Sequence, residues 1–231
     1  MKIKILGVCG SPVKGGNTDI FLGEALKAAR EIRDVETEVV LLSQKDINDC
    51  QHCNWCLRGQ GEGQFCKQKD DMSEIYPLLL EADGLLLASP VYFGRLSGRL
   101  ASFLDRLRVF VFGNYYRGML KDKVGGSLAV GWSRHGGLET TLLSINYAFW
   151  QMGMLHAPEH GRFLGATGVT GPSGSGEFTP SDRHQVLKDE FGLNSARQLA
   201  KRVVELIEII KLGKAAREAN HAQILNTRSA L

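Results

Sequence analysis

The sequence contains no long apolar run. No segment approaches the roughly 20 apolar residues that a helix needs to span a bilayer, and residues 1–8 lack the apolar core and cleavage site of a secretory signal. A large net charge is also missing, because 28 basic residues nearly balance 25 acidic ones and leave a formal charge of +3. These absences argue against a membrane protein and against nucleic acid as the main partner, and they predict a cytoplasmic location.

Cysteine is scarce, with five residues in a chain of 231, and four of the five lie between Cys50 and Cys66. Because thiols stay reduced in the cytoplasm, such a cluster indicates metal binding or redox chemistry before disulfides. The remaining cysteine, Cys9, ends an apolar segment and is expected to behave as a small buried hydrophobe.

Short apolar segments alternate with segments of helical period, which is typical of βα units in a doubly wound, parallel α/β sheet. We expect one domain over residues 1–213, with residues 46–70 inserted as a polar, cysteine-rich loop, and residues 214–231 as a C-terminal arm that is either helical or partly disordered. Five strands are predicted at residues 3–9, 38–42, 85–89, 123–130 and 154–158. Residues 161–180 are predicted to be a loop, and the last long helix to run from Asp182 to Leu212.

Residues 10–18 connect the first predicted strand to a helix, where backbone N–H groups and the positive end of the helix dipole converge on an anion. The glycines of this loop allow a close approach of the backbone, and Ser11, Asn17 and Thr18 add hydrogen-bonding side chains. A phosphate monoester suits this place. The alternative is a tight turn in which Asn17 or Thr18 simply caps the helix. The loop has neither a Walker pattern nor Gly-x-Gly-x-x-Gly, which disfavours nucleoside triphosphates and a dinucleotide.

Two further loops are expected at the same edge of the sheet, because ligands of doubly wound folds with strand order 2-1-3-4-5 lie at the carboxyl ends of strands one and three. The loop after the third strand contains Pro90, Val91, Tyr92, Phe93 and Gly94. Its aromatic side chains are predicted to meet a planar ring, or alternatively to pack into the core. The loop after the fourth strand is rich in glycine and donors, and it supplies a third wall through Trp132, Ser133, Arg134, His135 and Gly136. His135 is equally compatible with a solvent-exposed position.

Five motifs carry a resemblance: Gly10-Ser11-Pro12 through Gly16-Asn17-Thr18, Asp70-Asp71-Met72, Ala82-Asp83, Ser89-Pro90-Val91-Tyr92-Phe93 and Phe103-Leu104-Asp105-Arg106. They resemble the NADPH-dependent FMN reductase family, and the cysteines make the chain most similar to the iron–sulfur flavoproteins of that superfamily. The resemblance implies a flavodoxin-like fold, with FMN phosphate on Ser11, Asn17 and Thr18 and the flavin ring between the second and third loops. Lys14 stands where relatives commonly carry arginine and would attract the phosphate as a point charge. Relatives also form dimers and tetramers, so a homodimer or homotetramer is expected.

The cysteines Cys50, Cys53, Cys56 and Cys66 form C-x2-C-x2-C with a fourth cysteine after a longer gap. This spacing favours a [4Fe-4S] cluster, because three closely spaced thiolates can hold three corners of a cubane. Zinc, which more often uses two separated pairs, and cysteines without a metal remain the alternatives.

The predicted function is that of a flavin-dependent oxidoreductase that passes electrons between FMN and the cluster, with ferredoxin or NAD(P)H as partner. One alternative is a cluster-free NAD(P)H-dependent FMN or quinone reductase, and a second is a non-enzymatic, redox-responsive binding protein. Four arginines after the third strand (Arg95, Arg99, Arg106 and Arg108) offer a place for the 2'-phosphate of NADPH or a subunit interface, although a solvated helix face is the commoner outcome.

Overall fold

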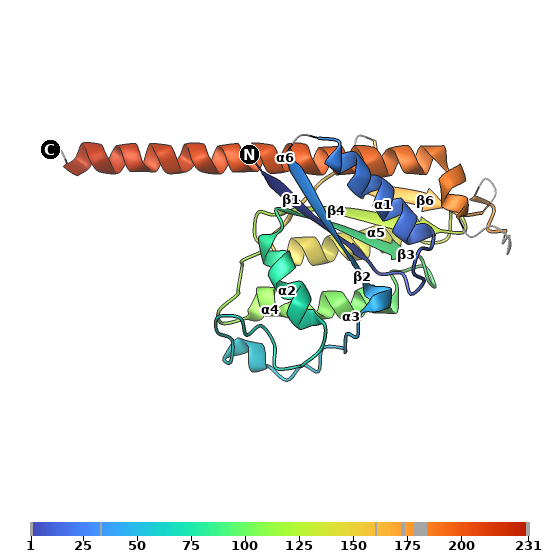
Figure 1. Cartoon of the computed structure of the whole chain (residues 1–231), viewed down its shortest axis with the longest axis horizontal. Coiled ribbons are helices and arrows are strands. Elements are labelled where there is room, and N and C mark those ends of the chain that lie inside the picture. The colour runs from blue at the N-terminus through green and yellow to red at the C-terminus, as the bar shows by residue number, and fades with distance from the viewer. Residues whose placement is uncertain (1, 33, 160, 172–173, 178–183, 230–231) are drawn as a thin grey trace.

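A parallel sheet forms the centre of the protein. The computed structural model describes residues 2–32, 34–159, 161–171, 174–177 and 184–229, with side chains through residue 221. The strands are β1 (Ile3–Cys9), β2 (Val35–Leu41), β3 (Gly84–Pro90), β4 (Val124–Gly131), β5 (Leu155–His156) and β6 (Ala166–Val169). They run parallel in the order β2-β1-β3-β4-β5, with β6 also on β4 (Figure 1). The predicted flavodoxin-like strand order is therefore confirmed.

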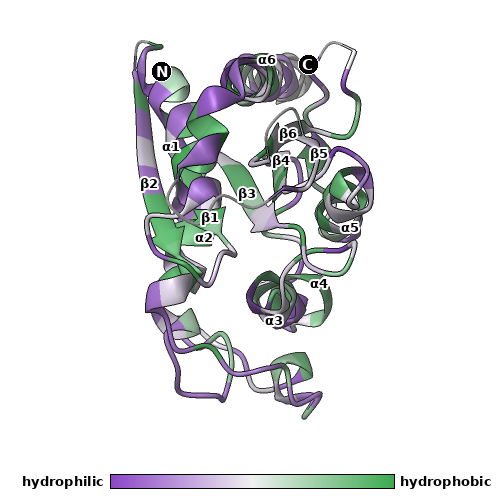
Figure 2. Cartoon of the chain, turned by 90° about the vertical axis from the view of Figure 1, so that its right-hand side faces the viewer, coloured by the Kyte–Doolittle hydropathy of each residue, from purple (hydrophilic) through white to green (hydrophobic). Residues whose placement is uncertain are grey.

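Helices cover both faces of the sheet (Figures 1 and 2). They are α1 (Asn17–Arg30), α2 (Met72–Glu81), α3 (Gly98–Arg106), α4 (Arg108–Phe112), α5 (Leu138–Gln151) and α6 (Glu190–Ser229). Residues of α1 and α6 share one apolar cluster with the sheet, while residues of α2 to α5 share the other. Strand β3 is buried along its whole length, as expected for a central strand with helices on both faces.

The edge of the sheet differs from the prediction, because it consists of two short strands in line. β5 pairs with Val124 and Gly125 at the start of β4, and β6 pairs with residues 128–131 at its end. Residues 166–169 had been predicted to lie in a loop because the surrounding segment is rich in glycine and threonine. The pairing forms because such small residues fit closely, as at Gly165, where a side chain would collide with the backbone oxygen of Ser127.

The C-terminal helix also differs from the prediction in both of its bounds. α6 begins at Glu190 and continues through Gly213 to Ser229. Asp189, the residue before the helix, accepts a hydrogen bond from Gly192 N at 3.0 Å through its Oδ1. A single glycine costs a helix only about 1 kcal/mol relative to alanine, which is too little to end it at Leu212. The last part of α6 projects beyond the sheet (Figure 1). Among the described residues, no helix is both long and apolar enough to cross a bilayer.

Candidate functional site

Three loops predicted to share a ligand meet at the carboxyl ends of β1, β3 and β4. The first and second loops are joined because Ser97 Oγ donates to Gly10 O at 2.6 Å. The second and third loops are joined because Thr140 Oγ1 donates to Gly94 O at 2.5 Å, and because any side chain at Gly137 would collide with the Gly94 backbone. The parallel order of the strands thus brings together residues that lie 87 positions apart in the sequence, such as Gly10 and Ser97.

The first loop leaves the N-terminus of α1 without a side-chain cap, since the residue before the helix is Gly16. Ser11 and Thr18 are buried, while Lys14 is exposed beside them. Asn17 has a role that the sequence did not reveal, because its Oδ1 accepts a hydrogen bond at 3.0 Å from Val186 N, in the turn before α6. The backbone N–H groups at the start of α1 therefore have no side-chain cap, and such a helix N-terminus is a favourable binding place for a phosphate.

Asp19, in the first turn of α1, is a residue beside this loop that the sequence analysis missed. Its Oδ2 accepts from Gly15 N at 2.6 Å, and its Oδ1 accepts from the Cys9 thiol at 2.7 Å. Burial and this carboxylate raise the pKa of Cys9, so that the thiol stays protonated and holds Asp19 in place. An acidic residue in the first turn of a helix, four positions after a glycine, was the signal that could have revealed this arrangement.

The second loop exposes its aromatic side chains. Tyr92 is 44% exposed and Phe93 is fully exposed, so the alternative in which they pack into the core is wrong. Phe93 and Gly94 both have positive φ angles, of 50° and 72°, and Phe93 is thereby held in a conformation that bulky residues rarely adopt. Val91 is fixed by donating from its N–H to Val130 O at 2.8 Å, while Pro90 is buried at the end of β3. Strain of this kind is typical of ligand sites.

The third loop turns back on itself and is held by a second glycine-rich segment. Gly136 N donates to Ser133 O at 3.2 Å, and Arg134 N donates to Gly174 O at 3.1 Å. His135 is exposed, which is compatible with both of its interpretations, and Trp132 is 59% exposed. The aromatic and basic side chains of this loop are therefore exposed at the same edge as Tyr92 and Phe93.

The four clustered cysteines lie on the loop between β2 and α2, and they differ in exposure. Cys56 is buried, Cys50 and Cys66 are half-buried, and Cys53 is exposed. Burial raises the pKa of Cys56, Arg108 opposes this shift, and negative charge on Cys66 or Cys50 would raise the pKa further. These three thiols are thus within electrostatic reach of one another. Within the described part of the chain, no three histidine, cysteine or acidic side chains are arranged to hold a metal ion.

The base of the cysteine loop is held by a buried ion pair. Arg106 and Asp70 have side chains only 1% exposed, and Arg106 Nη1 contacts Asp70 Oδ2 while Nη2 donates to Oδ1 at 3.1 Å. Asn48 joins the two ends of the loop, because its N–H donates to Asp70 at 3.0 Å and its carbonyl accepts from Arg106 at 2.9 Å. Burial would raise the pKa of Asp70, but the bonds from Arg106 and Asn48 outweigh it and lower that pKa.

The tip of the cysteine loop is fixed by aromatic stacking and one glutamine. Phe65 stacks between Tyr76 and Tyr116, with ring centroids 4.9 and 4.0 Å away. Gln60 is buried, and it donates to Phe65 O at 2.9 Å and accepts from the backbone of Tyr115 and Tyr116. The polarity of residues 46–70 had argued against core residues here, yet Phe65 and Cys56 belong to the apolar core. The loop is therefore an ordered part of the domain.

The four arginines after β3 do not form a common anion site. Arg106 is paired with Asp70 and buried, so the expectation of a solvated face is wrong at this position. Arg99 donates to Leu42 O at 3.0 Å, and Arg108 donates to Asn54 Oδ1 at 2.8 Å. Arg106 and Arg108 thus fasten the cysteine loop to α3 and α4, while Arg99 holds the segment that follows β2.

Comparisons with known proteins identify the family of the chain. A family model described as NADPH-dependent FMN reductase matches residues 3–166. An iron–sulfur flavoprotein of Methanocaldococcus jannaschii is 39% identical over 209 residues, which cover 90% of this chain and 100% of that protein. An iron–sulfur flavoprotein of Methanosarcina thermophila is 34% identical, with 90% and 97% covered.

Solved structures show the same fold. The crystal structure of RosB with bound 8-demethyl-8-formylriboflavin-5'-phosphate matches with a TM-score of 0.62 at 20% identity, covering 94% of this chain and 87% of that one. An apo NADH:FMN oxidoreductase matches with a TM-score of 0.53. The chain therefore belongs to the iron–sulfur flavoproteins within the NADPH-dependent FMN reductase family, and it is a flavin-dependent oxidoreductase of flavodoxin-like fold.

Proposed function

We propose that this protein passes electrons between FMN at the three loops and a [4Fe-4S] cluster held by Cys50, Cys53, Cys56 and Cys66. The observation that carries the proposal is the ordered cysteine loop, which presents four thiols free of disulfides on a scaffold fixed at its base and its tip. Its electron partner is ferredoxin or NAD(P)H. The relatives named iron–sulfur flavoproteins match this chain over nearly their whole length, which supports the same reading.

The donor set of the cysteine loop fits an iron–sulfur cluster. Four thiolates on one loop suit iron, and Arg108, whose positive charge opposes the raised pKa of Cys56, offsets the negative charge that they would gather. Arg106 also lies within electrostatic reach of Cys66, although Asp70 balances its charge. A cluster bound here would supply one-electron transfer, while the polypeptide supplies the thiolates and the positive charge behind them.

The three loops fit FMN. In this proposal the phosphate meets the uncapped N-terminus of α1, and the ring lies between the second and third loops. The contacting residues are Ser11, Lys14, Gly16, Asn17, Thr18, Pro90, Val91, Tyr92, Phe93, Gly94, Trp132, Ser133, Arg134, His135 and Gly136. FMN is stable in one-electron and two-electron reduced states and so connects partners of both kinds. A homodimer or homotetramer in the cytoplasm is part of the proposal, because a second copy would shield the exposed Cys53.

A cluster-free NAD(P)H-dependent FMN or quinone reductase is the competing function. It is favoured by the exposure of Cys53 and by the lack, among the described residues, of three side chains arranged around a metal position. Visible absorbance of protein purified without oxygen separates the two. The proposal expects flavin bands together with a broad iron–sulfur shoulder that dithionite bleaches, and about four iron atoms per chain. Flavin bands with zinc or without metal would establish the cluster-free reductase instead.

The flavin assignment predicts a selective loss of affinity when the first loop is altered. Replacing Asn17 and Thr18 by alanine removes two polar side chains from the phosphate end, and hydrogen bonds to a charged group contribute about 1.5–3 kcal/mol each. FMN is therefore expected to bind about tenfold more weakly or worse, with riboflavin much less affected. Titration of the apoprotein with each ligand measures the two affinities. If both ligands weaken alike, the phosphate does not lie in this loop.

A further inference from the structure

The first loop is closed on itself by its own hydrogen bonds. Val13 N donates to Ser11 Oγ at 3.1 Å, and Gly16 N donates to Val13 O at 3.3 Å. Gly15 N donates to Asp19 Oδ2 at 2.6 Å, which joins the end of the loop to the first turn of α1. Gly15 has a φ angle of 66°, in the left-handed region that favours glycine, and a side chain there would meet no atom within 4 Å. Because this side of Gly15 is open, its backbone is held by the bond to Asp19 rather than by packing.

The carboxylate of Asp19 is itself held by the end of β1. Its Oδ1 accepts a hydrogen bond from the Cys9 thiol at 2.7 Å. Cys9 is 0% exposed, so the thiol has no access to water. Burial, and after it the carboxylate, raises the pKa of Cys9, which keeps the thiol a donor. One carboxylate oxygen thus contacts the buried strand and the other contacts the loop, so that Asp19 connects the loop to the sheet.

The negative charge of Asp19 has two opposite effects at a phosphate site. An acidic residue in the first turn stabilises a helix, yet it repels a phosphate bound at the same helix end. If stabilising the helix were its whole role, removing the charge would only favour FMN. The two hydrogen bonds give Asp19 a second role, because a loop that is already held in its binding conformation loses less conformational freedom when a ligand binds. Substitutions that remove the charge but differ in hydrogen bonding separate the two roles.

We propose that Asp19, held by the Cys9 thiol, is a positioning residue for the FMN phosphate. It fixes the backbone of Gly15 and so keeps the loop in a shape that leaves the start of α1 open to the phosphate. The inference deepens the proposed function and rests on its placement of the phosphate in the first loop. The role concerns binding alone, and it needs neither electron transfer nor a cluster.

Two substitutions with the same change of charge test the proposal. Asp19→Asn keeps an oxygen for Gly15 N and places an amide N–H toward the sulfur of Cys9, which is a weak acceptor. Asp19→Ala keeps neither group. FMN is therefore expected to bind Asp19→Ala about tenfold more weakly than Asp19→Asn, while riboflavin, which has no phosphate, binds both variants alike. Titration of each apoprotein with the two flavins, followed by flavin fluorescence, measures the affinities.

A second pair of variants tests whether Cys9 acts through Asp19. Cys9→Ala removes the thiol donor and is expected to weaken FMN binding in the wild type. In the Asp19→Ala background the same substitution should have no further effect, because the carboxylate that the thiol holds is already gone. Glu74 is the matched control, since it is an exposed acidic residue in the first turn of another helix, α2. Glu74→Gln and Glu74→Ala should bind FMN alike.

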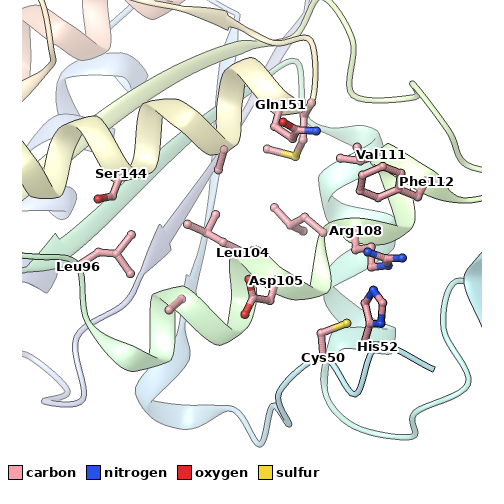
Figure 3. A pocket seen from close by; sticks show the side chains of 14 residues that line it. Cys50, His52, Leu96, Leu104, Asp105, Arg108, Val111, Phe112, Ser144 and Gln151 are labelled. Atoms are coloured by element: carbon pink, nitrogen blue, oxygen red, sulfur yellow. The ribbon is translucent and has the colours of Figure 1, made fainter. Parts of the chain in front are cut away.

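The cysteine side of the molecule provides an internal control for the fold of the variants. A groove with a volume of about 570 Å³ lies between α3, α4 and α5 and opens beside Cys50 and His52 (Figure 3). None of residues 9–19 lines this groove. Iron content after anaerobic reconstitution should therefore be the same in the Asp19 variants as in the wild type. A wild type without iron would refute the cluster and leave this inference standing.

The flavin affinities decide the proposal. Equal FMN affinity of Asp19→Asn and Asp19→Ala would overturn it, because Asp19 would then act by its charge alone. An equal loss of FMN and riboflavin in Asp19→Ala would overturn it as well, since the whole site and not the phosphate end would have changed. A wild type that binds FMN no better than riboflavin would refute the placement of the phosphate in the proposed function, and the inference with it. That result is distinguishable because it appears before any residue is changed.

Discussion

Replacing Arg106 by methionine is expected to lower the free energy of unfolding by about 3–5 kcal/mol, because it leaves the carboxylate of Asp70 buried without its partner. The same substitution releases Asn48 O at the base of the cysteine loop. Urea denaturation followed by circular dichroism measures the change. A loss below about 1 kcal/mol would show that the pair is not buried in solution.

Two controls separate the buried pair from surface charge and from the size of the side chain. Arg202→Met breaks a pair with Glu205 whose side chains are 37% and 58% exposed, and it is expected to cost less than about 1 kcal/mol. Asp70→Asn combined with Arg106→Met removes both charges and is expected to restore part of the loss.

The same pair predicts the pH dependence. In the wild type the folded pKa of Asp70 is lowered, so its contribution to stability is present above the ordinary carboxyl pKa and is lost as the pH falls through the lowered value. In Arg106→Met the main lowering influence is gone and burial raises the pKa of Asp70. The free energy of unfolding that Arg106→Met loses relative to the wild type should therefore be smaller at about pH 5 than at about pH 8.

Replacing Cys56 by serine is expected to abolish most of the bound iron and the iron–sulfur absorbance while leaving FMN bound. Cys56 is the most buried of the four clustered cysteines, and the loop that carries it follows β2, whereas the phosphate loop follows β1. Iron and flavin are measured per chain after anaerobic reconstitution. The variant should still accept two electrons at the flavin from a donor such as NAD(P)H, yet lose electron transfer to ferredoxin.

Cys9→Ser is the matched control for this experiment. Cys9 is buried more deeply than Cys56, and its thiol donates to Asp19 beside the phosphate loop. The Cys9→Ser variant should keep its iron, and any effect of the substitution should appear as weaker binding of FMN. Full iron content in Cys56→Ser, or equal loss of iron in both variants, would contradict the assignment of the cluster.

The strand order and most of the core could be predicted because each buried strand carries its own signal. β3 is apolar throughout, and β1 ends in a glycine-rich turn that leads into an amphipathic helix. The split edge strand could not be predicted, since β5 has only two residues and β6 consists of small residues that other loops also use. Pairing with β4, rather than local preference, makes these residues a strand.

The candidate site was partly predictable for the same reason. The loops at residues 10–18, 90–94 and 131–137 follow strands, so the parallel order alone brings them to one edge. The scaffold of the cysteine loop was hidden, because Gln60 and Arg106 read as surface residues until their partners are known. Their partners, which include Tyr116 and Asp70, lie tens of positions away in the sequence. Patterns within a single sequence do not reveal contacts between residues so far apart.

The stacking of Phe65 has a consequence for the repair of the protein after oxidative damage. Because the loop is held by Tyr76, Tyr116 and the Asp70–Arg106 pair, we expect it to fold before any inorganic atoms bind. Oxygen damage that dismantled a cluster would then spare the polypeptide. Repair would need only reduced thiols, iron and sulfide delivered to a chain that has stayed folded, so that one molecule could serve through several cycles of damage and reassembly.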